Sequence, residues 1–400
     1  MKNEFHRDAV AIVLQGRACG LGVIRSLGRE RIPLLVADPH RNAPGLHSRY
    51  CKSLIIPDPE IEPEMALDSL MKEGEKLKEK GVLFPSSDAF TIFTSKHRKM
   101  LSEHFKMILS PGNMTGELVN KRYQYAEARR VGMPMPATYY PSTLEEAEVI
   151  KDDLEYPVII KPSLSHVFLS KLNRKAFIAN GPKDLLGIFN QQLPPNHPVI
   201  VQSFIPGPVT NLYETETYVG QNGKVLAFLV RQKLRQFPED TGMGTLERTI
   251  NDPEIVRLGT DFVQSIGFKG IANLEFKMDD RDGKYKLMEI NPRYSLQNIS
   301  ATKAGINFPL IQYLDLTEQP LPSIPDYADD VTWLDASRDI LAYRSHKKEV
   351  SLKSFIQSWL GADCYAYHSW DDPIPAIARF STFTDLISDL SAQMNRARGR

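Results

Sequence analysis

Two carboxylates and one amide near position 290 have the residue types and spacing of a magnesium site. Glu275 lies on one predicted strand, and after the polar turn 279–283 Glu289 and Asn291 lie on the next. If the strands pair as a hairpin centred on Asp282, Glu275 stands opposite Glu289 and all three side chains share one face. The apolar residues expected on the opposite face are Leu274, Phe276, Met278, Met288 and Ile290. Carboxylate and amide oxygens are the hard ligands preferred by magnesium that bridges nucleotide phosphates.

A guanidinium group extends this chemistry. Arg293 follows Asn291 by two residues, so it could meet the negative charge that develops on a transferring phosphoryl group. The alternative is a solvated acidic surface, which is the usual role of acidic residues on the open face of a hairpin. The order of carboxylate, apolar residue, amide, proline and arginine after a buried strand argues against that alternative.

Two lysines earlier in the chain stand at the ends of predicted elements. Lys161 ends the apolar strand 156–161, and a charge at the end of a buried strand needs a partner such as phosphate. Lys121 lies near the start of the predicted helix 117–131, which a glycine and two prolines terminate at 132–136. For Lys121 the alternative is an ordinary surface position on that helix.

Three basic residues alternate on a later predicted strand: Arg231, Lys233 and Arg235. Alternate residues of a strand face one side, and neighbouring cations repel one another unless an anion or acidic side chains compensate them. We predict that they meet a phosphate or a substrate carboxylate, with Arg231 and Arg235 as catalytic residues and Lys233 as a phosphate ligand. The alternative is a basic outer face of the strand.

The elements that position these residues fall into three regions. In residues 1–115, short apolar strands alternate with helices, which predicts an α/β lobe with a parallel sheet covered on both faces. Residues 116–320 combine helices with strands that include a hairpin, the pattern of an α+β domain. Three prolines, at 320, 322 and 325, predict a linker to a small C-terminal extension, 321–400.

The first region carries part of a dinucleotide-binding pattern. Gly16, Gly20 and Gly22 precede a helix, and Asp38 ends the second strand, where an acid can hold a ribose. The spacing G-x-x-x-G-x-G does not fit the G-x-G-x-x-G pattern. We therefore expect these glycines to allow a tight turn and close helix packing, with an NAD-dependent oxidoreductase as the rival interpretation.

The composition is typical of a soluble globular protein, with 42% apolar and 24% charged residues. Lys and Arg number 49, as do Asp and Glu, so no global basic field favours nucleic acid as a partner. Three scattered cysteines predict neither a disulfide framework nor a cysteine metal site. The N-terminus lacks an apolar signal core and no 18-residue apolar run follows, so we expect a cytoplasmic protein without a membrane partner.

In this order and at these separations, the motifs resemble the ATP-grasp superfamily, whose members activate a carboxylate with ATP. The resemblance implies a Rossmann-like N-terminal lobe followed by two α+β lobes that clasp ATP, at about 135–201 and 202–320. It assigns Lys121, Lys161 and Lys233 to ATP binding. It also assigns to adenine the strand edge formed by Gln202, Ser203, Phe204 and Ile205.

The resemblance further implies ATP and Mg²⁺ as cofactors, with Mn²⁺ as an alternative ion, held by Glu275, Glu289 and Asn291. The carboxylate–amine ligase-like members join small-molecule carboxylates, such as amino acids, to amines through an acyl-phosphate and release ADP and phosphate. Two alternatives remain within the fold: an ATP-binding regulator without turnover and a carboxylase-type enzyme. A homodimer is the expected assembly, because it is the commonest among soluble oligomers.

Three segments depart from the family pattern or leave it open. The segment 163–171 stands where relatives carry a glycine-rich loop, and it contains no glycine; its serines, His166, Lys171 or Lys175 could take over that role. The candidate ribose carboxylates are Glu214 and Glu216, with a solvent-facing strand as the alternative. Residues 237–245 are expected to form a mobile loop near the acceptor site.

Overall fold

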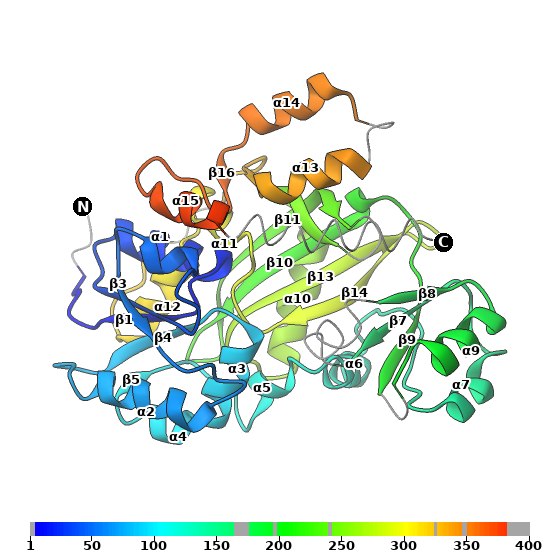
Figure 1. Cartoon of the computed structure of the whole chain (residues 1–400), viewed down its shortest axis with the longest axis horizontal. Helices are drawn as coiled ribbons and strands as arrows, with labels where there is room; N and C mark the ends of the chain where they lie inside the picture. The colour runs from blue at the N-terminus through cyan, green and yellow to red at the C-terminus, as the bar shows by residue number, and fades with distance from the viewer. Residues whose placement is uncertain are drawn as a thin grey trace.

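The computed structural model describes residues 5–163, 176–194, 198–238, 242–323, 326–345 and 350–381. Three β-sheets organise this part of the chain, with five, four and seven strands. The five-stranded lobe lies at the left of Figure 1, the four-stranded lobe at the right, and the seven-stranded sheet between them. The structure therefore combines an α/β lobe with α+β lobes, as the sequence predicts.

The first sheet is parallel throughout, in the order β3-β2-β1-β4-β5. Its strands are β1 (Ala11–Leu14), β2 (Leu34–Asp38), β3 (Lys52–Ile55), β4 (Gly81–Pro85) and β5 (Phe105–Lys106). The helices of this lobe are α1 (Ala18–Arg29), η1 (Pro44–His47), α2 (Pro63–Gly74), α3 (Asp88–Lys96) and α4 (Arg98–Leu101). Alternate residues of β1 enter two different cores, because helices cover both faces of the sheet.

The prediction for this lobe missed one strand. Lys52–Ile55 forms β3 at the sheet edge, where most of its side chains are exposed and no buried pattern marks it. The helical segment that follows β4 divides into α3 and α4 at His97. The glycine interpretation is confirmed: a Cβ on Gly20 would lie 1.9 Å from the Gln15 carbonyl oxygen.

Asp38 supports the same structural reading of the glycine-rich turn. Its carboxylate is buried and accepts hydrogen bonds from the backbone amides of Gly16, at 2.7 Å, and His40, at 2.8 Å. The acid that could have held a ribose is therefore occupied in closing the turn.

The second sheet is antiparallel, in the order β6-β9-β7-β8. It consists of β6 (Thr138–Tyr139), β7 (Val158–Pro162), β8 (Phe177–Ala179) and β9 (Val199–Ser203). It packs against α7 (Leu144–Ile150) and α9 (Pro182–Gln191) around a core of its own. The predicted helix 117–131 is two helices, α5 (Met114–Glu117) and α6 (Lys121–Arg130), because the Asn120 side chain accepts from the Arg122 amide and starts α6.

The third sheet has the order β14-β13-β10-β11-β12-β15-β16. Its strands are β10 (Leu212–Val219), β11 (Val225–Phe237), β12 (Met243–Ile250), β13 (Gly270–Asp279), β14 (Lys284–Asn291), β15 (Thr332–Leu334) and β16 (Cys364–Tyr365). Its neighbouring helices are η2 (Val209–Asn211), α10 (Pro253–Ser265), α11 (Asn298–Lys303), α12 (Phe308–Leu316), α13 (Ala336–Ser345) and α14 (Leu352–Leu360). The loop predicted at 237–245 is wrong at its end, because Met243 already pairs with Phe237; residues 239–241 lie outside the described part.

The C-terminal region completes the large sheet and contacts the first lobe. β15 pairs with β12, and Figure 1 shows α13 and α14 above the sheet. Beyond β16, Asp372 forms a buried ion pair with Arg25 of α1 just before α15 (Ile374–Ser381). The division into three regions at 115 and 320 stays a proposal. Within the described residues, no helix has the length and apolar character needed to cross a membrane.

The Arg25–Asp372 pair yields a stability prediction. Arg25 Nε lies 3.0 Å from Asp372 Oδ2, and the two side chains are 2% and 1% exposed. Asp372→Asn should lower the free energy of unfolding by about 3–5 kcal/mol, because it leaves the Arg25 charge buried without a counter-charge. Urea unfolding followed by circular dichroism measures the change.

The neighbouring pair Arg29–Asp371 is the control, because its side chains are 37% and 40% exposed. Asp371→Asn should cost about 1 kcal/mol or less, since solvent screens the pair. Equal losses of unfolding free energy in the two variants would contradict the prediction that the buried Arg25–Asp372 pair contributes more to stability than the exposed pair.

Candidate active site in the cleft between the lobes

A cleft of about 840 Å³ lies between the four-stranded and seven-stranded sheets. Its walls come from α6, β7, the segment 203–210, β11, β13 and β14. Such a volume is typical of small-molecule and cofactor sites. Most of the residues predicted to do chemistry line this cleft: Lys121, Lys161, Ser203, Phe204, Ile205, Lys233, Arg235, Glu275, Glu289, Asn291 and Arg293.

The acidic hairpin has the predicted register. Glu275 pairs with Glu289, and Asn273 pairs with Asn291, across β13 and β14. β10 continues the row, because Glu214 pairs with Glu275 on its other side. Three carboxylates thus stand side by side on neighbouring strands.

One apolar residue differs from the prediction. Leu274, Phe276 and Ile290 lie in the core below the hairpin, as expected, but Met288 lines the cleft beside Glu289. The register shifts between Glu275 and Phe276, so β14 carries one extra residue at this point. Such a bulge turns neighbouring side chains away from strict alternation.

Each hairpin carboxylate has a lysine partner. Lys121 contacts Glu289, and Lys233 Nζ donates to Glu275 Oε2 at 2.9 Å. Burial opposes ionisation of Glu289, but Lys121, Lys161 and Arg293 outweigh it and lower the pKa of Glu289 to about 2. Glu289 is therefore ionised at neutral pH, as a metal ligand must be.

The oxygen atoms of these side chains could hold a hard cation such as magnesium only if a bound ligand or water supplied further oxygen ligands. Among the described residues, no group of three His, Cys, Asp or Glu side chains is placed to hold a metal. Glu275, Glu289 and the amide of Asn291 supply three oxygen-bearing side chains on one face, and Asn291 Nδ2 lies 3.5 Å from Glu275 Oε1. Magnesium favours six oxygen ligands and commonly takes several from phosphates and water, so this set is compatible with it.

The two predicted phosphate lysines are buried in the cleft wall. Lys121 is 5% exposed at the first position of α6, so the surface-helix alternative is wrong. Lys161 is 9% exposed, and its Nζ donates to the Tyr125 hydroxyl at 3.0 Å. Burial lowers the pKa of Lys161 to about 8, although Glu289 and Glu275 partly offset the effect. In the described part of the chain no carboxylate contacts Lys161 directly, so the burial of its charge is only partly offset.

Of the four residues predicted to bind adenine, three line the cleft and one does not. Ser203, Phe204 and Ile205 line the cleft, whereas Gln202 lies outside its lining and is fully buried. Gln202 Nε2 donates to Thr138 Oγ1 at 2.9 Å, so its side chain ties β9 to β6. Its predicted role in binding adenine stays untested.

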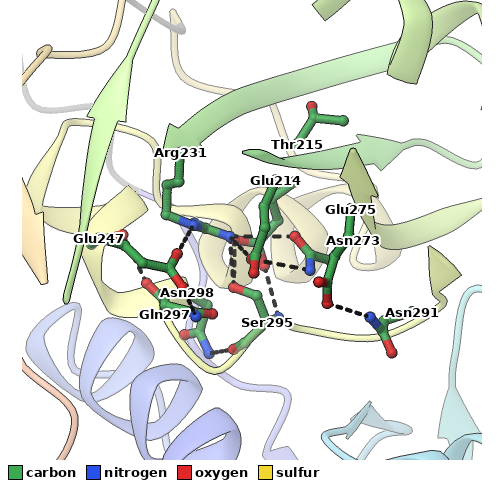
Figure 2. Close-up of polar contacts among 12 residues, drawn as sticks. Glu214, Thr215, Arg231, Glu247, Asn273, Glu275, Asn291, Ser295, Gln297 and Asn298 are labelled. Atoms are coloured by element: carbon green, nitrogen blue, oxygen red, sulfur yellow. Dashed lines mark hydrogen bonds and ion pairs between the residues drawn. The ribbon is translucent and has the colours of Figure 1, made fainter. Parts of the chain in front are cut away.

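A fully buried charge network contains Arg231, which does not line the cleft (Figure 2). Its Nη1 donates to Glu216 Oε2 at 2.9 Å and its Nη2 to Ser295 Oγ at 2.8 Å. Glu214 and Glu247 lie 3.7 and 3.8 Å from the same guanidinium. Acidic side chains thus compensate this cation, and its predicted catalytic role stays a prediction.

Arg235 differs from Arg231 because it reaches the cleft. Its Nε and Nη2 donate to the two carboxylate oxygens of Asp339 on α13, at 2.9 and 2.6 Å. A register shift on either side of Arg235 displaces it from the regular pairing of β11 with β12. Acidic side chains therefore compensate all three predicted basic residues, with Glu214 near both Arg231 and Lys233 and Asp339 paired with Arg235.

The two candidate ribose carboxylates are buried, so the solvent-facing alternative is wrong for both. Glu214 is 3% exposed and lines the cleft, which keeps it available to a ligand. Glu216 is fully buried and accepts from Arg231 and from the Ser295 amide and hydroxyl. The segment proposed to replace the glycine-rich loop, including His166, Lys171 and Lys175, lies outside the described residues.

Further cleft residues were not predicted: Asp88, Asn273, Lys277, Met288, Ser295 and Gln297. Asn273 and Lys277 alternate with Glu275 on β13, so strand periodicity could have identified them. Asp88 contacts Arg293 across 205 positions of the chain, a proximity that no local pattern signals.

Part of the chain matches a family model, and longer stretches resemble curated proteins. Residues 214–336 match a family described as ATP-grasp in the biosynthetic pathway with Ter operon. A D-aspartate ligase of Enterococcus faecium is 27% identical over 281 residues, which cover 66% of each chain. A carbamoyl phosphate synthase large chain of Pyrococcus furiosus is 24% identical over 219 residues, 52% of this chain and 20% of that protein. The chain thus spans less than two thirds of the length of these relatives.

Solved structures show the same fold at low sequence identity. An N5-carboxyaminoimidazole synthetase from Staphylococcus aureus superposes with a TM-score of 0.65 at 14% identity, covering 87% of this chain and 88% of that one. An L-amino acid ligase from Bacillus licheniformis gives a TM-score of 0.57 at 16% identity, covering 82% and 79%. Residues 214–336 therefore match an ATP-grasp family, and the fold of the chain is that of the ATP-grasp enzymes among these solved structures, with the carboxylate row and the two buried lysines in one cleft.

Proposed function

We propose that this protein is an ATP-dependent ligase that joins a carboxylate to an amine and releases ADP and phosphate. The observation that carries the proposal is the convergence of Lys121 and Lys161 on the paired carboxylates Glu275 and Glu289 in one cleft. The surrounding charges suit an anionic ligand that brings its own divalent cation. The matched ligases of amino acids support the reaction class.

ATP would lie between the two sheets with its base at the segment 203–205. Ser203 Oγ is buried there and has no hydrogen-bond partner among the described residues, which suits a polar base edge. Met288 offers an apolar surface on the same cleft wall. Lys277 Nζ donates to the Ile205 carbonyl at 2.8 Å and holds this segment against β13.

Magnesium would be held by Glu275, Glu289 and Asn291, where it would neutralise charge on the ATP phosphates. Lys121 and Lys161 would bind phosphate oxygens as point charges. Both lysines already lie beside the carboxylates, so the protein would not need to move a cation into place. This preorganisation supports phosphoryl transfer by positioning and charge neutralisation.

The substrate carboxylate would attack the γ-phosphorus of ATP, forming an acyl-phosphate and ADP. Arg293 would stabilise charge on the transferred group from the end of β14. The amine nitrogen would then attack the acyl carbon, and phosphate would leave with the electrons of the C–O bond. This sequence requires no side-chain nucleophile.

The first prediction concerns turnover. ADP release with Mg-ATP should require two additions. One is an acid, either D-aspartate or another acid from a pool, and the other is an amine. Glu289→Gln and Lys161→Met should each lower kcat by about 100-fold or more, because each removes a charge that acts on the phosphates. Lys72→Ala and Asp152→Ala are controls, since their side chains are 66% and 78% exposed.

Other outcomes of this assay separate the alternatives. Magnesium-dependent ATP binding without ADP release in any pool would support a regulator. Turnover that depends on bicarbonate would support a carboxylase-type enzyme, and one structural neighbour is a biotin carboxylase from Campylobacter jejuni. Absence of ATP binding would contradict the proposal altogether.

The second prediction concerns pH. Because the pKa of Lys161 is about 8 without ligand, about half of the molecules carry the Lys161 charge at pH 8. Phosphate favours the charged form, so ATP affinity should fall as pH rises from 7 to 9, and binding near pH 8 should take up protons.

Isothermal titration in two buffers of different ionisation enthalpy measures this proton uptake. Lys161→Met should bind ATP more weakly and lose the uptake near pH 8, whereas Lys72→Ala should behave as wild type. An unchanged pH profile in Lys161→Met would show that another group is responsible.

A further inference from the structure

The five-stranded lobe reaches the cleft through one side chain. Among the described residues of that lobe, Asp88 alone lines the cleft. Asp88 is the first residue of α3 and follows the carboxyl end of β4. In the strand order β3-β2-β1-β4-β5, the topology reverses between β1 and β4, and open α/β sheets bind ligands at the carboxyl ends of such strands.

Only one of the two Asp88 carboxylate oxygens accepts a hydrogen bond from a described side chain. Its Oδ1 accepts from Arg293 Nε at 2.6 Å, and Arg293 is its sole side-chain partner in the described part of the chain. The side chain is 36% exposed. One carboxylate oxygen therefore remains for a ligand.

This carboxylate lies beside the proposed reaction centre. Arg293 connects the two, because its Nη2 also donates to Asn291 Oδ1 at 3.1 Å. The same end of the cleft carries the charges of Lys121 and Lys161, which suit phosphates but repel an incoming ammonium. Asp88 is placed to offset that repulsion on the side of the first lobe.

We propose that Asp88 binds the ammonium form of the amine substrate and directs it toward the acyl-phosphate. This inference rests on the proposed ligase function. The ammonium gives one proton to solvent before its nitrogen attacks the acyl carbon. The second proton leaves as the C–N bond forms, and phosphate departs with the C–O electron pair. Asp88 supplies binding and orientation and is not consumed.

Hydroxylamine provides the test, because it is largely uncharged at pH 8 and traps acyl-phosphates as hydroxamates without needing an ammonium site. With D-aspartate as the acid and pooled amino acids as the amine, Asp88→Asn should raise the amine concentration for half-maximal ADP release by about 10- to 100-fold. Hydroxamate formation, and the KM values for ATP and D-aspartate measured in that assay, should stay within about twofold of wild type.

Two further variants complete the design. Asp88→Glu keeps the charge and should recover part of the amine affinity. Asp68→Asn removes a 61% exposed carboxylate from the same lobe and should change neither assay.

Each remaining outcome overturns a defined claim. If Asp88→Asn lowers hydroxamate formation as much as ligation, Asp88 only positions Arg293 and the amine site is wrong. A raised KM for D-aspartate in the hydroxamate assay would place Asp88 on the acid and likewise overturn the inference. Absence of hydroxamate and ADP from the wild type would overturn the ligase function, and the amine site with it.

Discussion

A row of like charges across three strands is the constraint on which the rest of this structure depends. Glu214, Glu275 and Glu289 stand opposite one another on β10, β13 and β14. Like charges at directly opposed positions destabilise a sheet unless other groups compensate them. All three carboxylates line the cleft that we propose binds ATP and its metal.

Two lysines, one from α6 and one from β11, compensate this row. Lys121 of α6 contacts Glu289, and Lys233 of β11 lies 2.9 Å from Glu275 and 3.4 Å from Glu214. In the proposed reaction, the same lysines that balance the carboxylates without ligand would bind phosphates when magnesium takes over the carboxylates. The charges would therefore be balanced both in the cleft without ligand and in the cleft with ATP and magnesium bound.

Buried charges also explain why the C-terminal region belongs with the site. Arg235 at the cleft is held by Asp339 of α13, and Asp372 holds Arg25 of the first lobe. Removing either acid would leave a buried guanidinium without a counter-charge, which is far more costly than losing an exposed pair. The region predicted as an extension beyond residue 320 therefore contributes a strand pairing and two buried ion pairs that the rest of the chain needs.

Local chemistry in the sequence determined the parallel first sheet, the hairpin register of Glu275 with Glu289, and several of the charged residues around the cleft, because strand alternation and turn residues act over short separations. Only the tertiary structure decided which cations face the cleft. Arg231 and Arg235 have the same local sequence pattern. Arg231 is nevertheless buried among glutamates, whereas Arg235 lines the cleft. Their partners come from distant segments, as Asp88 does for Arg293, and burial and ion pairing between distant segments leave no periodic signal in the chain.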